Sequence, residues 1–287
     1  MNNYLNKISY LCFILIASLL GCNIIKREQV YEQSSTPIPI NPADTLKPDR
    51  KVFLEIFTGF TCGQCPGSTK DGLNELTGSK LDNKTVILKI HHGSFAQPTG
   101  LYRINFQTSV GNTLGDIYSI LGYPVGIVNR NKYNNSYLVG PGDWNNKVGL
   151  VVQKADVDLK IIKVYDTNSK SLKISITSTL YNNFVNKINS IAYLAEDSII
   201  YGQKDYSVEP EYVPNFVHRH VLRDAIQSPT GNDLFAANAN KGTKATKEFT
   251  PYTLKPEWNA KHCEVIVVIT DAVTGEVLQV EKKKVIE

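Results

Sequence analysis

The chain has 287 residues, a formal net charge of +4 and five cysteines. This length is enough for two ordinary domains, each with its own core. The basic residues are scattered along the chain rather than clustered, so the pattern excludes a nucleic-acid-binding footprint, and no nucleic acid is expected as a partner.

Residues 1–21 have the pattern of an export signal. A polar start containing Lys7 leads into the apolar stretch 10–20, which is too short and wrongly flanked for a spanning helix. Because Gly21 precedes Cys22, the segment resembles a bacterial lipoprotein signal, whose cleavage leaves the cysteine carrying lipid such as palmitate. The membrane would then be reached through this N-terminal lipid. The alternative is an ordinary cleaved signal in which Cys22 is coincidental.

Residues 22–50 read as a tether. The stretch is polar and contains several prolines between residues 34 and 42, a composition typical of semi-extended linkers. Residues 23–27, directly after Cys22, contain no acidic run. This favours an outer-membrane position facing the periplasm over one facing the cell exterior.

The pair Cys62 and Cys65 is the most informative feature. It follows the apolar run 51–57, so a strand is expected to end in a turn that carries both sulfurs. A nearby helix N-terminus would favour the thiolate of Cys62, and Cys65 could then resolve a mixed disulfide. Two alternatives remain, an inert structural disulfide and a metal site. A zinc site needs four ligands, which the neighbouring residues do not readily supply, so no metal or cofactor is expected.

Residues 85–92 form a second predicted strand, which ends in His91 and His92. A weak helical stripe at 68–81 lies between the two strands, so a parallel crossover is predicted. The carboxyl ends of parallel strands meet at one edge, and both histidines should therefore lie near the cysteines. They are candidates for tuning the thiol, against the alternative of polar residues at a strand end.

The rest of the first half predicts a helical region over 102–121, a turn containing Tyr123 and Pro124, and a short strand after it. A hairpin through residues 134–135 follows, and a helix is expected from residue 143 to about residue 154.

The second half is predicted to be all-β. Seven segments have the alternation or the composition of strands, with turn residues between them: 157–164, 172–177, 191–195, 216–222, 246–254, 262–269 and 277–285. This spacing suggests a β-sandwich resembling immunoglobulin or fibronectin type III domains. His218 and His220 are expected on one face of a strand, without a third ligand, and Cys263 reads as a buried small hydrophobe.

The order of these elements resembles the thioredoxin fold. The phrases at 55–59, Cys65-Pro66, 122–130 and 218–223 more particularly resemble outer-membrane lipoproteins of Bacteroidota related to outer membrane protein twenty-eight. The resemblance implies an α/β thioredoxin-like domain over 51–154 followed by the β-sandwich over 155–287. It also implies a cis Pro124 that faces the dithiol, with Tyr123 and Pro124 shaping a groove for an extended polypeptide.

Two positions depart from the thioredoxin pattern. Ile56 stands where a buried carboxylate often moves protons, and Pro66 cannot donate a backbone hydrogen bond. Pro66 also suits the first position of a helix, which would leave Cys62 in a loop before it.

Two functional hypotheses follow. In the first, the protein is a lipid-anchored thiol-disulfide oxidoreductase acting on exported proteins that carry thiols or disulfides. In the second, it is a non-enzymatic envelope binding or adhesion lipoprotein with a structural disulfide. The sequence does not decide between these two, nor does it give the direction of exchange.

Overall fold

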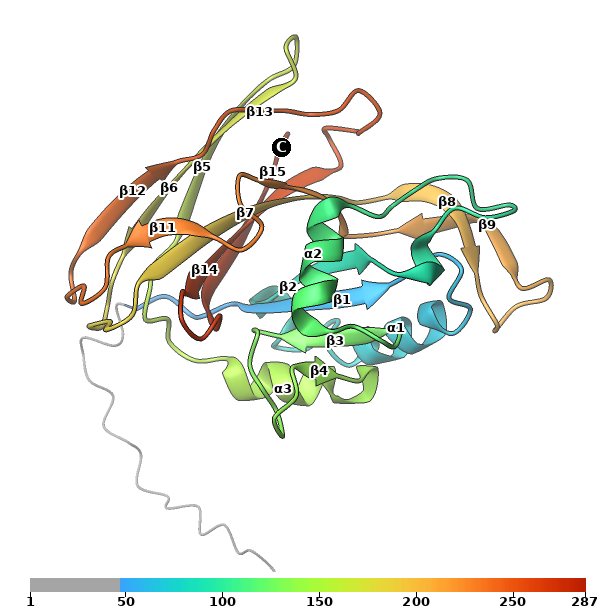
Figure 1. Cartoon of the computed structure of the whole chain (residues 1–287), viewed down its shortest axis with the longest axis horizontal. Helices are drawn as coiled ribbons and strands as arrows, with labels where there is room; N and C mark the ends of the chain where they lie inside the picture. Colours follow the sequence, from blue (N-terminus) through green and yellow to red (C-terminus); the bar gives the residue numbers. More distant parts are fainter. Residues whose placement is uncertain (1–46) are drawn as a thin grey trace, which may run out of the picture. The chain divides into compact units, whose positions relative to one another are not determined.

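The computed structural model describes residues 47–287. The predicted signal 1–21, Cys22 and most of the tether 22–50 lie outside the described residues. The described residues belong to one compact unit, in which strands greatly outnumber helices (Figure 1).

The helices of residues 47–287 are α1 (Cys65–Asn74), α2 (Ser109–Tyr118) and α3 (Trp144–Val151), with the 3-10 turns η1 (Asp82–Lys84), η2 (Ser94–Ala96) and η3 (Pro141–Asp143). The strands of the first half are β1 (Val52–Thr58), β2 (Thr85–His91), β3 (Val125–Val128) and β4 (Leu138–Val139). The strands of the second half are β5 (Lys160–Asp166), β6 (Ser171–Thr179), β7 (Ile188–Glu196), β8 (Ile199–Lys204), β9 (Tyr212–His218), β10 (Val221–Ile226), β11 (Asn232–Phe235), β12 (Lys244–Glu248), β13 (Tyr252–Thr253), β14 (Cys263–Asp271) and β15 (Val277–Lys284).

Within residues 47–287, one nine-stranded mixed sheet has the order β15-β14-β7-β10-β2-β1-β3-β4, with β11 paired to β7. The predicted parallel pairing of the first two strands is confirmed, since β1 and β2 run parallel with Thr58 opposite His91. Strand β10 joins β2 where Val221 lies opposite Lys89. The sheet therefore runs on from the first half into the second, across the predicted domain boundary between α3 and β5.

Strand β1 is buried on both faces, which explains why its sequence is hydrophobic except for Glu55 and Thr58. Phe53 and Phe57 belong to the core that includes residues of α2, whereas Leu54 and Ile56 belong to the core that includes residues of α3. The helices thus cover opposite faces of the sheet, α2 on one face and α3 on the other (Figure 1).

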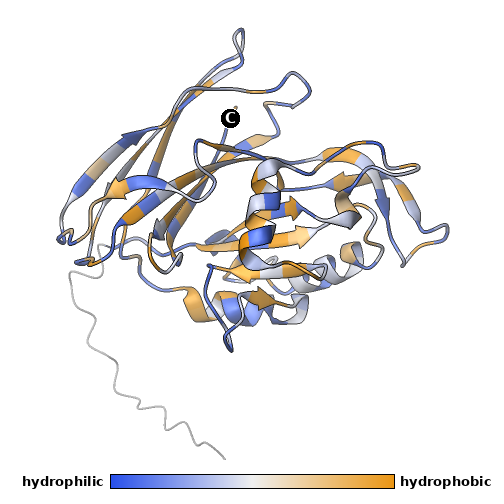
Figure 2. Cartoon of the chain, in the orientation of Figure 1, coloured by the Kyte–Doolittle hydropathy of each residue, from blue (hydrophilic) through white to orange (hydrophobic). Residues whose placement is uncertain are grey.

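A second layer covers the β7–β14 end of the large sheet. It is the four-stranded sheet of β5, β6, β12 and β13 within the described chain, and its inward side chains share one hydrophobic core with those of β7 and β14. Figure 2 shows hydrophobic residues concentrated along β7 and β14, where the two layers meet. Among residues 47–287, no helix has the length and apolar character needed to cross a membrane.

Several predicted boundaries were wrong. Helix α2 begins only at Ser109 because the Thr108 side chain accepts a hydrogen bond of 2.9 Å from the Gly111 N–H and caps the helix there. The predicted strand 216–222 is broken between β9 and β10, where His220 has a φ of 57°. His218 and His220 therefore do not share a face of one strand.

Candidate dithiol site

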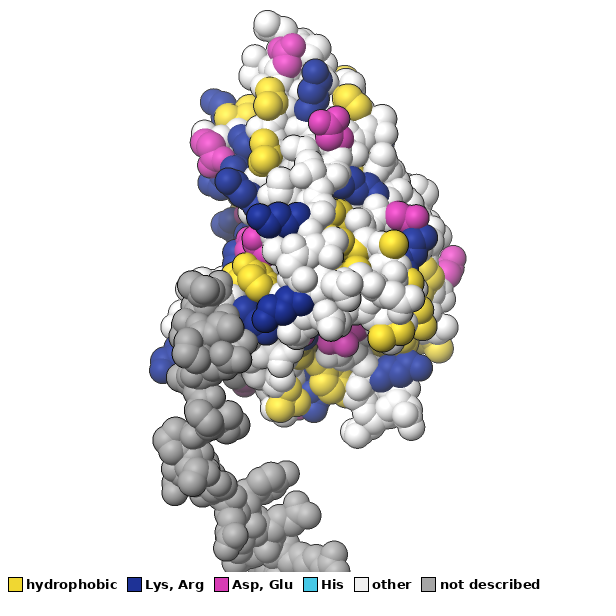
Figure 3. Space-filling view, turned by 90° about the vertical axis from the view of Figure 1, so that its left-hand side faces the viewer, with side chains coloured by type: hydrophobic (Ala, Val, Ile, Leu, Met, Phe, Trp, Pro, Cys, Tyr) yellow, Lys and Arg dark blue, Asp and Glu magenta, His cyan; other side chains and the backbone are white. Residues whose placement is uncertain are grey.

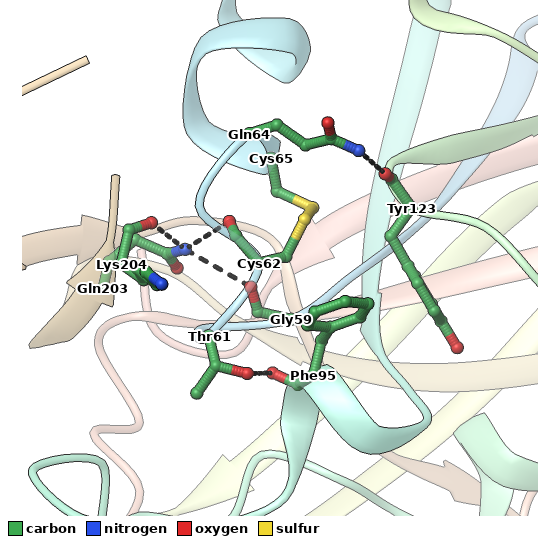
Figure 4. The surroundings of a disulfide bond; sticks show 9 residues. All are labelled: Gly59, Thr61, Cys62, Gln64, Cys65, Phe95, Tyr123, Gln203 and Lys204. Carbon is green, nitrogen blue, oxygen red and sulfur yellow. Dashed lines mark hydrogen bonds between the residues drawn. A yellow bond between two sulfur atoms is a disulfide. The ribbon is translucent and has the colours of Figure 1, made fainter. Parts of the chain in front are cut away.

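Cys62 and Cys65 form a disulfide in the turn between β1 and α1 (Figure 4). Helix α1 begins at Cys65, with Gln64 at the N-cap and Pro66 in the first turn, as expected for a proline that lacks an N–H. Cys62 thus precedes the helix. Both cysteines are nearly shut off from solvent, with 3% of Cys62 and 1% of Cys65 exposed.

Tyr123 lies next to this turn. The Gln64 side-chain amide donates a hydrogen bond of 2.8 Å to the Tyr123 carbonyl (Figure 4), and the peptide bond from Tyr123 to Pro124 is cis. The Tyr123 hydroxyl and His92 Nδ1 share a hydrogen bond of 2.6 Å. Burial lowers the pKa of His92, against the opposing Asp116 carboxylate, and burial raises the pKa of Tyr123.

His91 points away from His92, as alternation along a strand requires. Its ring packs against Phe60, Phe106 and His218, with the His91 and His218 ring centroids 5.5 Å apart. Burial, reinforced by the neighbouring His218, holds the pKa of His91 well below its usual value, so the ring is neutral near pH 7. In the described chain no hydrogen bond joins either predicted tuning histidine to a cysteine.

The hairpin of β8 and β9 covers the cysteine turn, which sequence reasoning missed. Gln203 Nε2 donates to the carbonyls of Gly59 and Cys62, each at 3.3 Å (Figure 4). The Lys204 N–H donates to the Phe60 carbonyl at 2.7 Å, and the Tyr206 N–H donates to the Gly63 carbonyl at 2.8 Å. These contacts join residues more than 130 positions apart, and no local pattern near residue 203 announces them.

A buried carboxylate does lie on β1, one residue before Ile56. Glu55 is fully buried and accepts hydrogen bonds from Arg130 Nε at 2.9 Å and Nη2 at 2.8 Å. Burial opposes the charge of Arg130, but the Glu55 carboxylate outweighs it and raises the pKa of the guanidinium. Both acceptor oxygens are therefore committed to Arg130, which leaves this carboxylate tied to structure rather than to the cysteines.

Cys263 is free and buried, which confirms the prediction from its strand context. Burial raises the pKa of its thiol to about 12, with the Glu196 carboxylate adding to the effect. No group of three His, Cys, Asp or Glu side chains among residues 47–287 could hold a metal ion. The predicted lipidation site Cys22 lies outside these residues.

One family model matches more than half of the chain. Residues 111–287 match the family "Outer membrane protein Omp28". The chain is similar to the structure of HBP35 of Porphyromonas gingivalis, with a TM-score of 0.61 and 15% identity over 82% of this chain and 75% of that chain. It also matches a domain of the outer membrane lipoprotein Omp28 from Porphyromonas gingivalis, with a TM-score of 0.30 and 18% identity over 46% of this chain and 89% of that chain.

None of the curated proteins matches the chain. The likeness to HBP35 shows a shared fold. The family match begins within α2, so it includes the Tyr123–Pro124 turn and excludes the Cys62–Cys65 turn.

Proposed function

Because the chain belongs to the Omp28 family of outer membrane proteins, we propose that it is a lipid-anchored envelope protein whose Cys62–Cys65 pair exchanges disulfides with exported proteins. The family match confirms the resemblance inferred from the sequence. The anchor would be lipid on Cys22, supported by the signal-like residues before it. The lack of an acidic run after Cys22 favours a periplasm-facing position, which protease treatment of intact cells tests.

A thioredoxin-like arrangement is the fold that we propose for the first half. In support, β2 is parallel and β3 antiparallel to β1, and α2 and α3 lie on opposite faces. The second half, in which the sheet β5–β6–β12–β13 covers β7 and β14, supports an immunoglobulin-like sandwich that shares its larger sheet with the first half.

One observation carries the redox proposal. The disulfide lies in the turn that follows the strand β1, and Gln64, between the two cysteines, donates a hydrogen bond to the Tyr123 carbonyl. In exchange, the reduced Cys62 thiolate attacks one sulfur of a substrate disulfide and releases a substrate thiolate. Cys65 then attacks Cys62 in the mixed disulfide, which re-forms the Cys62–Cys65 bond and releases the second substrate thiolate. The Tyr123–Pro124 turn would line the groove for the substrate chain.

Insulin-disulfide reduction by the full-length protein in detergent tests this proposal, with dithiothreitol as the reductant that returns the Cys62–Cys65 disulfide to the dithiol after each exchange. We expect Cys62→Ser to reduce turnover to background, because Cys65 alone has no second thiol in the turn to resolve a mixed disulfide. Cys263→Ser is the matched control and should stay within about twofold of wild type, since its thiol is buried and largely protonated. Equal rates for Cys62→Ser and wild type would remove the proposal.

The second candidate, a binding module with a structural disulfide, is favoured by the burial of both cysteines beneath the β8–β9 hairpin. The reduction potential in glutathione and dithiothreitol buffers separates the two. Structural disulfides in exported proteins lie below about −300 mV, whereas exchanging pairs lie well above it. A value in the lower range, together with unchanged insulin turnover in Cys62→Ser, supports the binding module.

A further inference from the structure

A pocket of about 340 Å³ opens beside the disulfide, on the side away from Tyr123. Cys65 and the start of α1 form one wall, the ends of β1 and β2 form the floor, and the β8–β9 hairpin forms the other wall. The volume lies within the range of small-molecule sites. Of the residues proposed for thiol exchange, Cys65 and His91 line this pocket, whereas Cys62, His92, Tyr123 and Pro124 do not.

The pocket is basic. Lys70, Lys89 and Arg219 line it, against the single carboxylate of Asp205, which already accepts hydrogen bonds from the backbone and hydroxyl of Ser207. Lys89 is half-buried and forms no ion pair or hydrogen bond through its ammonium group with any residue in the described range. Burial, with Arg219 adding to it, lowers the pKa of Lys89 to about 8.

Buried polar atoms without partners surround the same pocket. Three of the lining residues are Thr69, His91 and His218. One buried polar atom of each, Thr69 Oγ1, His91 Nδ1 and His218 Nε2, has no hydrogen-bond partner among residues 47–287. Each of these three side chains is more than nine-tenths buried. Buried polar groups are almost always hydrogen-bonded, so three such atoms around one pocket indicate a polar occupant from outside the described residues.

Apolar residues lie beside the charged groups in the lining. Val221 pairs with Lys89 across β10 and β2, Leu73 follows Lys70 on α1, and Phe216 also lines the pocket, so an occupant meets hydrocarbon next to cations. The Arg219 guanidinium lies 3.6 Å from the Asp197 carboxylate, which also attracts the Lys89 ammonium. Because cations and apolar side chains line the same pocket, an anion that carries hydrocarbon suits it better than inorganic phosphate, which carries none.

We propose that this pocket is a binding site for a small organic carboxylate, whose anionic head lies at Lys89 and Arg219 and whose apolar body lies against Phe216 and Val221. The site does not depend on thiol exchange, since it is complete while Cys62 and Cys65 are joined. Its failure and the failure of the redox proposal are therefore distinguishable.

Calorimetric titration of the full-length oxidised protein in detergent at pH 7 tests the site. The probes are benzoate, the uncharged benzamide of the same shape, and inorganic phosphate. We expect benzoate to bind at least about tenfold more tightly than benzamide and more tightly than phosphate. Lys89→Met should weaken benzoate about tenfold or more, whereas Lys80→Met, a matched change at an exposed lysine, should leave it unchanged.

A second variant guards against misfolding of Lys89→Met. Arg219→Gln changes a side chain that is 56% exposed, so the core is untouched, and benzoate affinity should fall about threefold or more. The proposal is overturned if no probe binds at millimolar concentration, if benzamide or phosphate binds as well as benzoate, or if both variants bind benzoate like wild type.

Discussion

Glu55 and Arg130 form a salt bridge that is sealed inside the sheet. Arg130 Nη2 also donates to the Tyr193 hydroxyl at 2.9 Å, and that hydroxyl donates to the Pro229 carbonyl at 2.8 Å. The network links β1 and the end of β3 with β7. With no water to replace a lost partner, each member depends on the others.

Arg130→Met should lower the free energy of unfolding by about 3–5 kcal/mol, because it leaves the buried Glu55 carboxylate without its counter-charge. Urea denaturation followed by circular dichroism measures the loss. Lys154→Met is the matched control: its partner Asp49 is half exposed, and such surface pairs contribute at most about 1 kcal/mol. Equal losses in the two variants would contradict the structural role of the buried pair.

At the scale of elements, the β8–β9 hairpin decides how accessible the disulfide is. The two N–H groups of the Gln203 amide are shared among three carbonyls, two of which, those of Gly59 and Cys62, belong to the loop that carries Cys62. The ring of Tyr206 lies over Gly63, where an added Cβ would come within 2.5 Å of it. The β8–β9 hairpin therefore packs closely on the cysteine turn, and a residue larger than glycine at position 63 would clash with Tyr206.

Gln203→Ala should speed the reduction of the Cys62–Cys65 disulfide by dithiothreitol. Loss of about 1 kcal/mol of hydrogen bonding to the turn raises the open population about fivefold. Thiol labelling against time under native conditions gives the rate. Gln153→Ala, at an exposed site, should match wild type. If both variants are reduced at the wild-type rate, the hairpin does not limit access.

The sequence predicted the first-half strands well because their signals are local. The runs 51–57 and 85–92 are mostly apolar, and they form β1 and β2 with the expected parallel pairing. The Cys62–Cys65 disulfide is also a local feature, because the two cysteines are three residues apart in the sequence. The position of His91 beside the same pocket as Cys65 followed from the expected parallel topology, and that of Tyr123 beside the turn followed from the resemblance to the thioredoxin fold.

The rest depended on contacts between distant residues. At Gly202 in β8, the Tyr212 ring of β9 occupies the space that a side chain would need. This contact follows from the pairing of the two strands and cannot be predicted from either strand alone. Lys89 was read as part of a strand, and its place in a pocket follows from β9 and β10 passing beside it. The ion pair between Arg130 and Glu55 forms because β3 lies beside β1, and the hydrophobic pattern alone does not specify that these strands are neighbours.

At the scale of the whole molecule, the large sheet joins the two predicted halves. Strand β10 pairs with β2, and one hydrophobic core contains residues of β1, β7, α2 and β14. The two halves share buried surface, so neither half can lose its structure without exposing the core of the other.

Residues 47–287 should therefore unfold in one cooperative transition. The chain has two tryptophans, Trp144 in the first half and Trp258 in the second. In Trp258→Phe, fluorescence reports on the first half while circular dichroism reports on the secondary structure of both halves, and the urea midpoints should coincide. Trp144→Phe reverses the reporter. Separated midpoints within either variant would instead establish two independently folding domains.

The edges of both sheets carry lysine. In the four-stranded sheet of the described chain, β5 and β12 each pair only with β6, and their sequences contain Lys160, Lys163, Lys244 and Lys247. The outer strand β15 ends in Lys282, Lys283 and Lys284. Figure 3 shows Lys and Arg side chains spread over this side of the molecule. Ammonium groups along an open edge discourage a strand of another copy from adding to it. Neighbouring molecules of this protein at high local concentration should therefore remain separate instead of joining edge to edge into a continuous β-sheet.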